Sequence, residues 1–253
     1  AKVFSTHNVN LVYTYLPTSA DKTYFLPPTL TNGNVHGIIV LNVYNERLLR
    51  LLAETQIPKV FLDTSSLVSP DELNGDLLLM ESRTSVRRIT SHLLEQGRTL
   101  PGFIGDIGYA QSNRQRYEGF CQALTDAGKK VDSSLCLTTP LGIDTYREEI
   151  DTFLSSLSRM PDAFVCASDY VACILMQLLE KRGLRVPEDV AVSGFDNNTE
   201  DLLAEHLTTV QVFNEELGAR LALQILYRIK YPNTPHEVTY LGTNVLYRDS
   251  TGD

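Results

Sequence analysis

The fold is decided by one stretch of the chain, Val190-Ala191-Val192-Ser193-Gly194-Phe195-Asp196-Asn197-Asn198, together with the earlier pair Ser168-Asp169. Apolar runs precede both segments and are typical of buried strands in a parallel sheet. The two strands end in carboxylates, Asp169 and Asp196, at the sheet edge where open parallel sheets bind ligands. The alternative for both residues is a turn or a helix N-cap, where aspartate is also favoured.

Outward from this stretch, apolar strand-like runs alternate with amphipathic helical patterns. This alternation predicts an α/β fold with one parallel sheet or a pair of them. The predicted strands are residues 9–16, 37–41, 57–63, 77–80, 102–105, 163–167 and 207–210, with an extended tail over 237–250. Ser112-x-x-Gln115 resembles a capping box and predicts that a helix over 113–127 starts there.

The composition limits the classes of protein to which the chain can belong. Its 253 residues suit one large domain or two small ones. The net charge of −9 argues against nucleic acid or an anionic membrane as a partner of this segment, although a basic module elsewhere in the protein stays compatible. No apolar run approaches the roughly 20 residues of a membrane helix, so no membrane partner is expected.

Searches for catalytic, cofactor and metal motifs find none. The chain has no Gly-x-Ser-x-Gly elbow, no Walker loop and no Gly-x-Gly-x-x-Gly. Its four cysteines form no Cys-x-x-Cys pair and share no zinc-ligand spacing with histidine, which favours free thiols in a reducing cytoplasm. We therefore expect no enzyme activity, no catalytic residues, no cofactor and no metal.

Arg116 is a second candidate site residue. It lies in an early turn of the predicted 113–127 helix, where a cation opposes the helix dipole at a cost of a few tenths of a kcal/mol. It also lies near the carboxyl end of the strand over 102–105. A guanidinium at that place suits vicinal hydroxyls, a carboxylate or a phosphate. The alternative is a surface arginine paired with Glu118 or Asp126.

Further segments fit a single pattern. They are Gly37-Ile-Ile-Val, Ile57-Pro-x-Val-x-Leu-Asp63, Phe103-Ile-Gly, Arg116-x-x-Gly-Phe-x-x-Ala-Leu124, Pro161-Asp-Ala-Phe-Val-Cys-Ala-Ser-Asp169, Gly183 to Asp196, Leu207-Thr-Thr-Val, Leu217-Gly and Leu246-Tyr-Arg-Asp-Ser-Thr251. In this order and spacing they resemble the effector-binding core of the lactose/galactose-repressor family of bacterial transcription regulators. The resemblance covers roughly residues 35–251.

The resemblance implies two Rossmann-like lobes of periplasmic-binding-protein type, with parallel sheets and a ligand cleft between the lobes. The implied crossovers lie near Met80-Glu81, Val210–Asn214 and Tyr231–Pro235. The N-terminal lobe is then expected over residues 1–80 plus 212–233, and the C-terminal lobe over 81–211 plus 234–253. Relatives also carry a first strand and a DNA-binding helix-turn-helix, which are expected upstream of residue 1 and absent from this chain.

The resemblance also implies the site residues. The positions that match Arg116 and Asp196 hold the ligand in the family, and those that match Ser112, Ser168 and Phe213 often line the cleft. Glu81 is the remaining candidate, at a point where the chain departs from the family, since relatives usually carry Asp-Asn at positions 80–81. Arginine with aspartate suits vicinal hydroxyls, so the expected effector is a sugar or a sugar derivative.

The expected partners follow from the same resemblance. Family regulators form homodimers and bind operator DNA through the upstream domain in the cytoplasm. The predicted helix over 170–182 is apolar nearly all round, which places it either in a core or at a subunit contact. The leading prediction is thus the ligand-sensing and dimerisation core of a transcription repressor. The alternative is a free-standing solute-binding protein of a sugar transporter.

Overall fold

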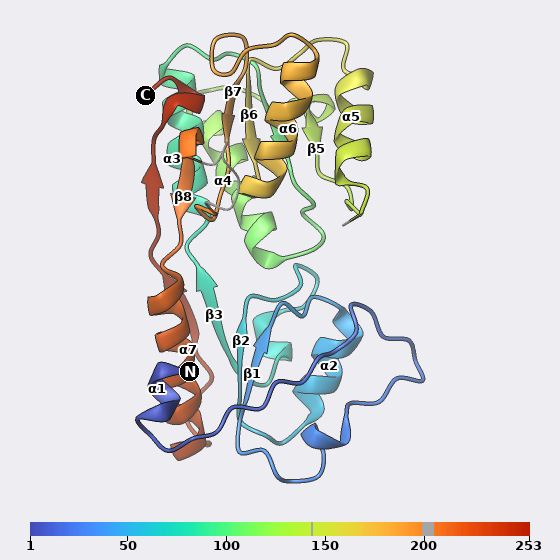
Figure 1. Ribbon diagram of the computed structural model, residues 1–253, viewed down its shortest axis with the longest axis vertical. Helices are drawn as coiled ribbons and strands as arrows, with labels where there is room; N and C mark the ends of the chain where they lie inside the picture. The colour runs from blue at the N-terminus through green and yellow to red at the C-terminus, as the bar shows by residue number, and fades with distance from the viewer. Residues whose placement is uncertain (143, 199–204) are drawn as a thin grey trace. The chain divides into compact units, whose positions relative to one another are not determined.

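A computed structural model describes residues 1–142, 144–198 and 205–253 as two lobes (Figure 1). The first lobe comprises Ala1–Met80, Ala110–Ser112 and Phe213–Leu241, and the second comprises Glu81–Tyr109, Asn113–Val212 and Gly242–Asp253. Each lobe is built on a four-stranded parallel sheet with helices packed on it. The predicted fold class, an α/β protein with two parallel-sheet lobes, is therefore confirmed.

The sheet of the first lobe has the strand order β1-β2-β3-β9. The strands are β1 (Ile38–Leu41), β2 (Lys59–Leu62), β3 (Asp76–Met80) and β9 (Val238–Leu241), and the helices are α1 (Lys2–Ser5), α2 (Glu46–Glu54) and α7 (Asn214–Lys230). Successive side chains of a strand point to opposite faces of the sheet. Leu77 and Leu79 accordingly share a core with Leu52 of α2, whereas Asp76 contacts α7.

The predicted strand over residues 9–16 is wrong. This segment belongs to no sheet, and most of its side chains lie in solvent, with Val12 75% and Tyr15 92% exposed, although Leu16 packs against the core. A strand is stabilised by a neighbour that accepts its amide hydrogen bonds. β1 has β2 on one side, and among the described residues no strand lies on its other side. The β-branched and aromatic residues of segment 9–16 indicate that it can form a strand, but they do not show that a neighbouring strand is present.

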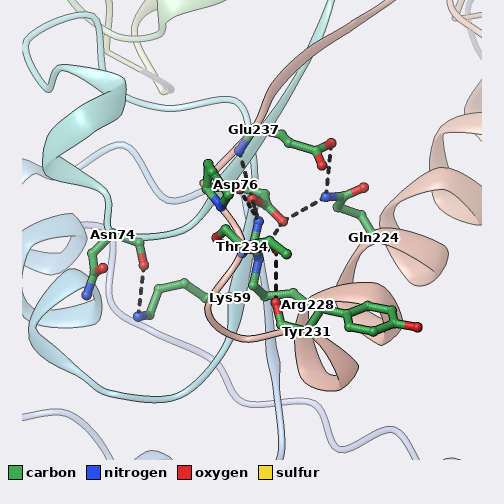
Figure 2. Close-up of polar contacts among 9 residues, drawn as sticks. Lys59, Asn74, Asp76, Gln224, Arg228, Tyr231, Thr234 and Glu237 are labelled. Atoms are coloured by element: carbon green, nitrogen blue, oxygen red, sulfur yellow. Dashed lines mark hydrogen bonds and ion pairs between the residues drawn. The ribbon is translucent and has the colours of Figure 1, made fainter.

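A buried ion pair joins α7 to the start of β3 (Figure 2). Arg228 donates from Nε to Asp76 Oδ2 at 3.0 Å and from Nη2 to Asp76 Oδ1 at 2.5 Å. Asp76 also accepts from Gln224 Nε2 at 2.8 Å and from the main-chain amide of Glu237 at 2.9 Å. Its carboxylate is fully buried yet accepts four hydrogen bonds, which offset its lost hydration.

The same arginine also holds the turn that follows α7, near the expected third crossover at residues 231–235. Its Nη1 donates to the carbonyl and the hydroxyl of Thr234, and its Nη2 also donates to the carbonyl of Pro235. The turn after α7 is thereby held against β3, and β9 continues from it beside β3, from Leu77 opposite Val238 to Met80 opposite Leu241. The first lobe consequently extends to Leu241.

Lys59, at the start of β2, is a buried ammonium without a carboxylate among the hydrogen-bond partners of its Nζ. Nζ donates to the carbonyl of Thr55 at 2.8 Å. It also donates to the carbonyl of Asn74 at 3.3 Å (Figure 2). Burial removes its hydration and lowers the pKa of Lys59 from 10.5 to about 8. The charged form is therefore disfavoured in the folded state relative to the unfolded chain.

This lowered pKa predicts a rise in stability at alkaline pH. Below pH 8 Lys59 is protonated in both states, whereas between pH 8 and 10.5 only the unfolded chain keeps the proton. The free energy of unfolding should then rise with pH, by on the order of 2–3 kcal/mol across that window. Chemical denaturation of the wild type and of Lys59→Met at several pH values measures the difference. Identical pH profiles in the two proteins would contradict this assignment.

The second lobe is wound on both faces of a sheet with the order β5-β4-β6-β7, and it also contains an antiparallel pair, β8 with β10. The strands are β4 (Pro101–Ile104), β5 (Cys136–Leu137), β6 (Ala163–Cys166), β7 (Ala191–Ser193), β8 (Thr209–Gln211) and β10 (Asn244–Leu246); the helices are α3 (Arg83–Glu95), α4 (Gln111–Asp126), α5 (Tyr146–Ser156) and α6 (Asp169–Lys181). Phe164 and Cys166 share a core with α5 and α6, whereas Phe103 contacts Phe120 of α4.

Most of the apolar surface of α6 is covered inside this lobe. Leu175, Leu178 and Leu179 are buried in the core, and Ile174 is nearly so. The apolar circumference that indicated either a core or a subunit contact is therefore largely accounted for by the core. In the part of the chain that the structure describes, none of the helices is both long and apolar enough to cross a membrane.

Candidate functional site

The candidate site lies at the carboxyl ends of β4, β6 and β7 in the second lobe. The chain leaves β4 to form β5 on one side and then returns to form β6 on the other. The connections that follow β4 and β6 consequently diverge, and this topological switch point is where open α/β sheets bind ligands. Arg116 belongs to α4, which follows β4, Asp169 starts α6 after β6, and Asp196 follows β7.

Arg116 is buried, with only 4% of its surface exposed. Its Nη1 donates to the main-chain carbonyl of Ala167 and, at 3.4 Å, to Asn113 Oδ1. The guanidinium carbon lies 3.7 Å from the centre of the Phe195 ring, in cation–π geometry. The alternative of a surface ion pair is wrong, because Glu118 pairs with Arg83 and Asp126 pairs with Arg87.

Arg116 and Asp196 meet in this lobe. Arg116 Nη2 lies 3.5 Å from Asp196 Oδ1, and the Asp196 side chain is 43% exposed. This contact is longer than a charge-assisted hydrogen bond of about 2.7–2.9 Å. The surrounding protein removes part of the hydration of the Asp196 carboxylate, which raises the pKa of Asp196 above its ordinary value. The positive charge of Arg116 opposes that rise. The pair thus combines the Arg116 guanidinium, which is fixed by its protein contacts, with the Asp196 carboxylate, which is still accessible to solvent.

Asp169 lies beside this pair, and both oxygens of its carboxylate accept hydrogen bonds. Its carboxylate accepts from Thr209 Oγ1 at 2.5 Å and from the main-chain amide of Asn198 at 2.7 Å. Burial raises the pKa of Asp169 to about 6, against the lowering effect of those two hydrogen bonds, and the charge of Asp196 adds to the rise. The N-cap alternative for Asp169 is wrong, since Ser168 occupies the N-cap of α6 and accepts from the amide of Val171 at 3.3 Å.

The other candidate residues have local partners. Ser112 and Phe213 belong to the first lobe. Ser112 is not a capping residue, because α4 starts at Gln111 and the Ser112 hydroxyl donates instead to Asp63 Oδ2 at 2.6 Å. Phe213 precedes α7 and is exposed. In the second lobe the Ser168 hydroxyl caps α6, as described above.

Glu81 has a structural task in the second lobe. Its Oε1 accepts from the amide of Thr84 at 2.6 Å, and its Oε2 accepts from the amide and the hydroxyl of Ser85 at 3.1 and 3.0 Å. The hydroxyl of Thr243 donates to the Glu81 carbonyl at 2.9 Å. Glu81 therefore satisfies amides at the N-terminus of α3, a role for which a carboxylate is well suited.

Sequence reasoning missed Phe195 and Thr209, which support Arg116 and Asp169. Phe195 lies in the quoted decisive stretch, but an aromatic after a buried strand usually indicates core, and only the structure places its ring under a guanidinium. Among the residues described, no group of three or more histidine, cysteine, aspartate or glutamate side chains is arranged to hold a metal ion.

A family model for the periplasmic binding protein-like domain matches residues 90–251, which is more than half of the chain. The chain belongs to this family. The resemblance to the effector-binding core of lactose/galactose-repressor regulators is also confirmed by the relatives that follow.

Two curated relatives are transcription regulators. The HTH-type transcriptional repressor PurR of Glaesserella parasuis is 27% identical over 206 residues, which cover 81% of this chain and 59% of that protein. The HTH-type transcriptional regulator DegA of Bacillus subtilis is 31% identical over 170 residues, or 66% of this chain and 48% of that protein. The chain thus spans about half to three-fifths of the length of these two relatives.

A solved structure of similar fold is the complex of the transcriptional regulator CelR with cellobiose. It is 26% identical, with a TM-score of 0.75, and the alignment covers 88% of this chain and 68% of that chain.

Proposed function

We propose that this chain is the small-molecule-sensing core of a bacterial transcription repressor, and that its effector is a sugar or a sugar derivative held by Arg116 and Asp196. Ser168, which caps α6 in the same lobe, is a further proposed contact, whereas Ser112 and Phe213 belong to the first lobe and stay predictions from the family resemblance. Glu81 was also a candidate, but its carboxylate is already used by three donors of α3. We therefore assign it helix capping rather than ligand contact.

The hydrogen-bonding state of Arg116 is the observation that carries this proposal. Its Nη1 side is occupied by Ala167 and Asn113, whereas its buried Nε has no hydrogen-bond partner among the described residues. An unpaired buried donor costs about 1–3 kcal/mol. Nε and Nη2 form one fork, and Asp196 approaches that fork only loosely. Two hydroxyls of a sugar would satisfy the fork and the exposed carboxylate together.

The proposal predicts that Arg116→Met abolishes or strongly weakens effector binding. Methionine keeps an unbranched apolar stem beside Phe195 but removes the charged donors, so affinity should fall by roughly 10- to 150-fold, as expected for hydrogen bonds to a charged group. Isothermal titration of neutral mono- and disaccharides, cellobiose among them, and of a sugar phosphate identifies the effector with the wild type first. The same titration is then repeated with the variant.

The matched control is Arg185→Met. Arg185 belongs to the same lobe, is exposed and pairs with Asp189, so its loss should leave effector affinity unchanged. Circular dichroism verifies that both variants fold. A sugar that binds Arg116→Met with undiminished affinity would overturn the site, and no binding by any sugar at millimolar concentration would overturn the ligand class.

The name of each curated relative supports a regulator rather than the alternative, a solute-binding protein of a transporter. We propose that effector binding changes the affinity of an upstream helix-turn-helix for operator DNA in the cytoplasm, and that the chain itself catalyses no reaction. The net charge of −9 agrees with a core that leaves DNA contacts to another domain.

We further propose that the protein is a homodimer, with α6 contributing to the interface. Tyr170 at the start of α6 is 60% exposed and packs edge-on against Tyr146 at 5.7 Å between ring centres. A groove of about 220 Å³ lies between these tyrosines, Arg147 and Gln177. A stable dimer would bury on the order of 2,000 Å² or more.

The dimer predicts a concentration-dependent sedimentation coefficient. Analytical ultracentrifugation of the full-length protein should find dimer at micromolar concentration, and Tyr170→Arg should shift the population toward monomer by placing an unpaired cation in the contact. Asp189→Arg is the control, because Asp189 is partly exposed and pairs only locally with Arg185. Monomer alone in the wild type would contradict the dimer.

A further inference from the structure

The main chain on both sides of Asp196 is bonded to one residue, Asp169. The amide of Asp169 donates to the carbonyl of Phe195 at 2.8 Å. The carboxylate of Asp169 accepts from the amide of Asn198 at 2.7 Å. The residue before Asp196 and the second residue after it are thus both tied to the N-terminus of α6.

Of the two amides between these points, that of Asp196 donates to the carbonyl of Val210 at 3.0 Å, and that of Asn197 reaches the Asp169 carboxylate through a hydroxyl. Asn197 donates its amide to Thr209 Oγ1 at 3.3 Å, and Thr209 Oγ1 in turn donates to Asp169 Oδ1 at 2.5 Å. Two consecutive amides after Asp196 therefore end at the two oxygens of one carboxylate. Thr209 is fully buried, so its hydrogen bond to Asp169 is shielded from solvent.

Segment 195–198, which these hydrogen bonds connect to Asp169, has an unfavourable backbone conformation that needs stabilisation. Asp196 has a φ of +108° and Asn197 a φ of +51°, in the left-handed region that most residues avoid. Residues held there cost on the order of 1–3 kcal/mol each and persist only where their surroundings determine them. Gly194 shows how closely Asp169 approaches, because a Cβ on Gly194 would lie 2.2 Å from Asp169 Oδ1.

We propose that Asp169 is a positioning residue of the effector site, whose carboxylate holds the 195–198 segment in the left-handed conformation that directs Asp196 toward Arg116. This inference rests on the proposed function for its effect on ligand affinity, and on the geometry alone for its effect on the backbone. Asp169 touches no ligand in this role.

The charges around Asp169 make its hydrogen bonds to segment 195–198 sensitive to pH. Asp196 faces it from the segment after β7 and raises its pKa, whereas Arg248 lowers it, and Arg116 lies beyond Asp196. The buried thiol of Cys166, at the end of β6, has its own pKa raised partly by the Asp169 charge. With a pKa of about 6, Asp169 takes up a proton between pH 7 and 5 and then accepts hydrogen bonds more weakly.

Three variants of the full-length protein test this role. Thr209→Val keeps the side-chain volume but removes the hydroxyl bridge, Thr209→Ser restores that bridge, and Asp169→Asn leaves one of the two donors without its acceptor. Asp189→Asn is the control on an exposed carboxylate of the same lobe. Amide hydrogen exchange of Asn197 and Asn198 is measured without ligand, and affinity for the sugar identified above is measured by calorimetry between pH 5 and 7.

We expect exchange at Asn197 in Thr209→Val, and at Asn198 in Asp169→Asn, to be at least about tenfold faster than in the wild type. Effector affinity should fall about tenfold in both variants and recover in Thr209→Ser. The wild type should lose affinity from pH 7 to 5, and Asp169→Asn should lack that step.

The two measurements, amide exchange and effector affinity, distinguish the positioning role of Asp169 from the proposed sugar-binding function. Unchanged exchange at both amides would overturn the positioning role, whatever the ligand. Faster exchange with unchanged affinity for a sugar that depends on Arg116 would overturn it as well, while the proposed function would stand. If no sugar binds the wild type, the proposed ligand class fails, and the exchange of the two amides alone decides whether Asp169 holds the segment.

Discussion

Replacing Asp76 with alanine should destabilise the first lobe by about 3–5 kcal/mol, because it leaves the guanidinium of Arg228 buried without its counter-charge. The two side chains are almost completely buried, and Arg228 makes two of its hydrogen bonds to this one carboxylate. The loss also removes the acceptor of the Glu237 amide and leaves Gln224 Nε2 with only its longer hydrogen bond to Glu237 Oε2 at 3.4 Å. Such a cost is a large part of the stability of a typical domain. Urea denaturation, with hydrogen exchange at the β3 amides, measures it.

Two comparisons distinguish the cost of leaving Arg228 without Asp76 from the net contribution of the ion pair to stability. The double variant Asp76→Leu with Arg228→Met removes both charges, and its cost should be clearly smaller than that of Asp76→Ala. The ion pair of Arg185 with Asp189 is the surface counterpart, and Asp189→Ala should change the denaturation midpoint little. Equal effects of Asp76→Ala and Asp189→Ala would show that the buried pair has no special cost when broken.

The ion pair illustrates which part of the fold the sequence could not predict. At the sequence level Arg228 is one of two cations in the last turn of a helix, where the dipole favours them. Its partner lies 152 positions earlier in the chain, and no local pattern connects the two. The same contact holds the turn between α7 and β9, so local patterns could not predict how the chain continues from α7 to β9 beside β3.

The strands and helices that were predicted well have a local cause. Apolar runs such as 163–167 need no particular partner to be recognised, because a strand buried on both faces must be apolar throughout. The segment over 9–16 carries a similar local signal but no neighbouring strand, so it joins no sheet and leaves Tyr15 in solvent. Local propensity thus indicates that a segment can be a strand, and pairing decides whether it becomes one.

The centre of the candidate site was predictable for a related reason. Asp196 follows a buried strand and a glycine, and Arg116 breaks the helix-dipole rule, so each carries a local signal that core residues lack. Their ion pair is found in the structure. The supporting residues Thr209 and Phe195 have no such signal, since a threonine in a strand and a buried phenylalanine are ordinary. Glu81 shows a limit of this reasoning, because departure from a family pattern does not distinguish a ligand contact from a helix cap.

Gly119→Ala should destabilise the second lobe by about 1–3 kcal/mol or more, although alanine is the better helix former. Gly119 lies within α4, where its exchange for alanine would gain about 1 kcal/mol if the site were open. However, a Cβ at this position would lie 2.2 Å from the main-chain carbonyl oxygen of Arg83. A main-chain atom of α3 cannot rotate away as a side chain can, so the two helices must separate, and the steric cost outweighs the propensity gain.

Gly218→Ala is the matched control, because it is the same change inside a helix with nothing within 4 Å of the new Cβ. There only the propensity term acts, and the variant should be stabilised by roughly 0.5–1 kcal/mol. Thermal and urea denaturation of the two variants should thus give shifts of opposite sign. Separation of α3 from α4 would also move the helix that carries Arg116, so Gly119→Ala should weaken effector binding while Gly218→Ala leaves it unchanged. Shifts of the same sign would refute the close contact between α4 and the start of α3.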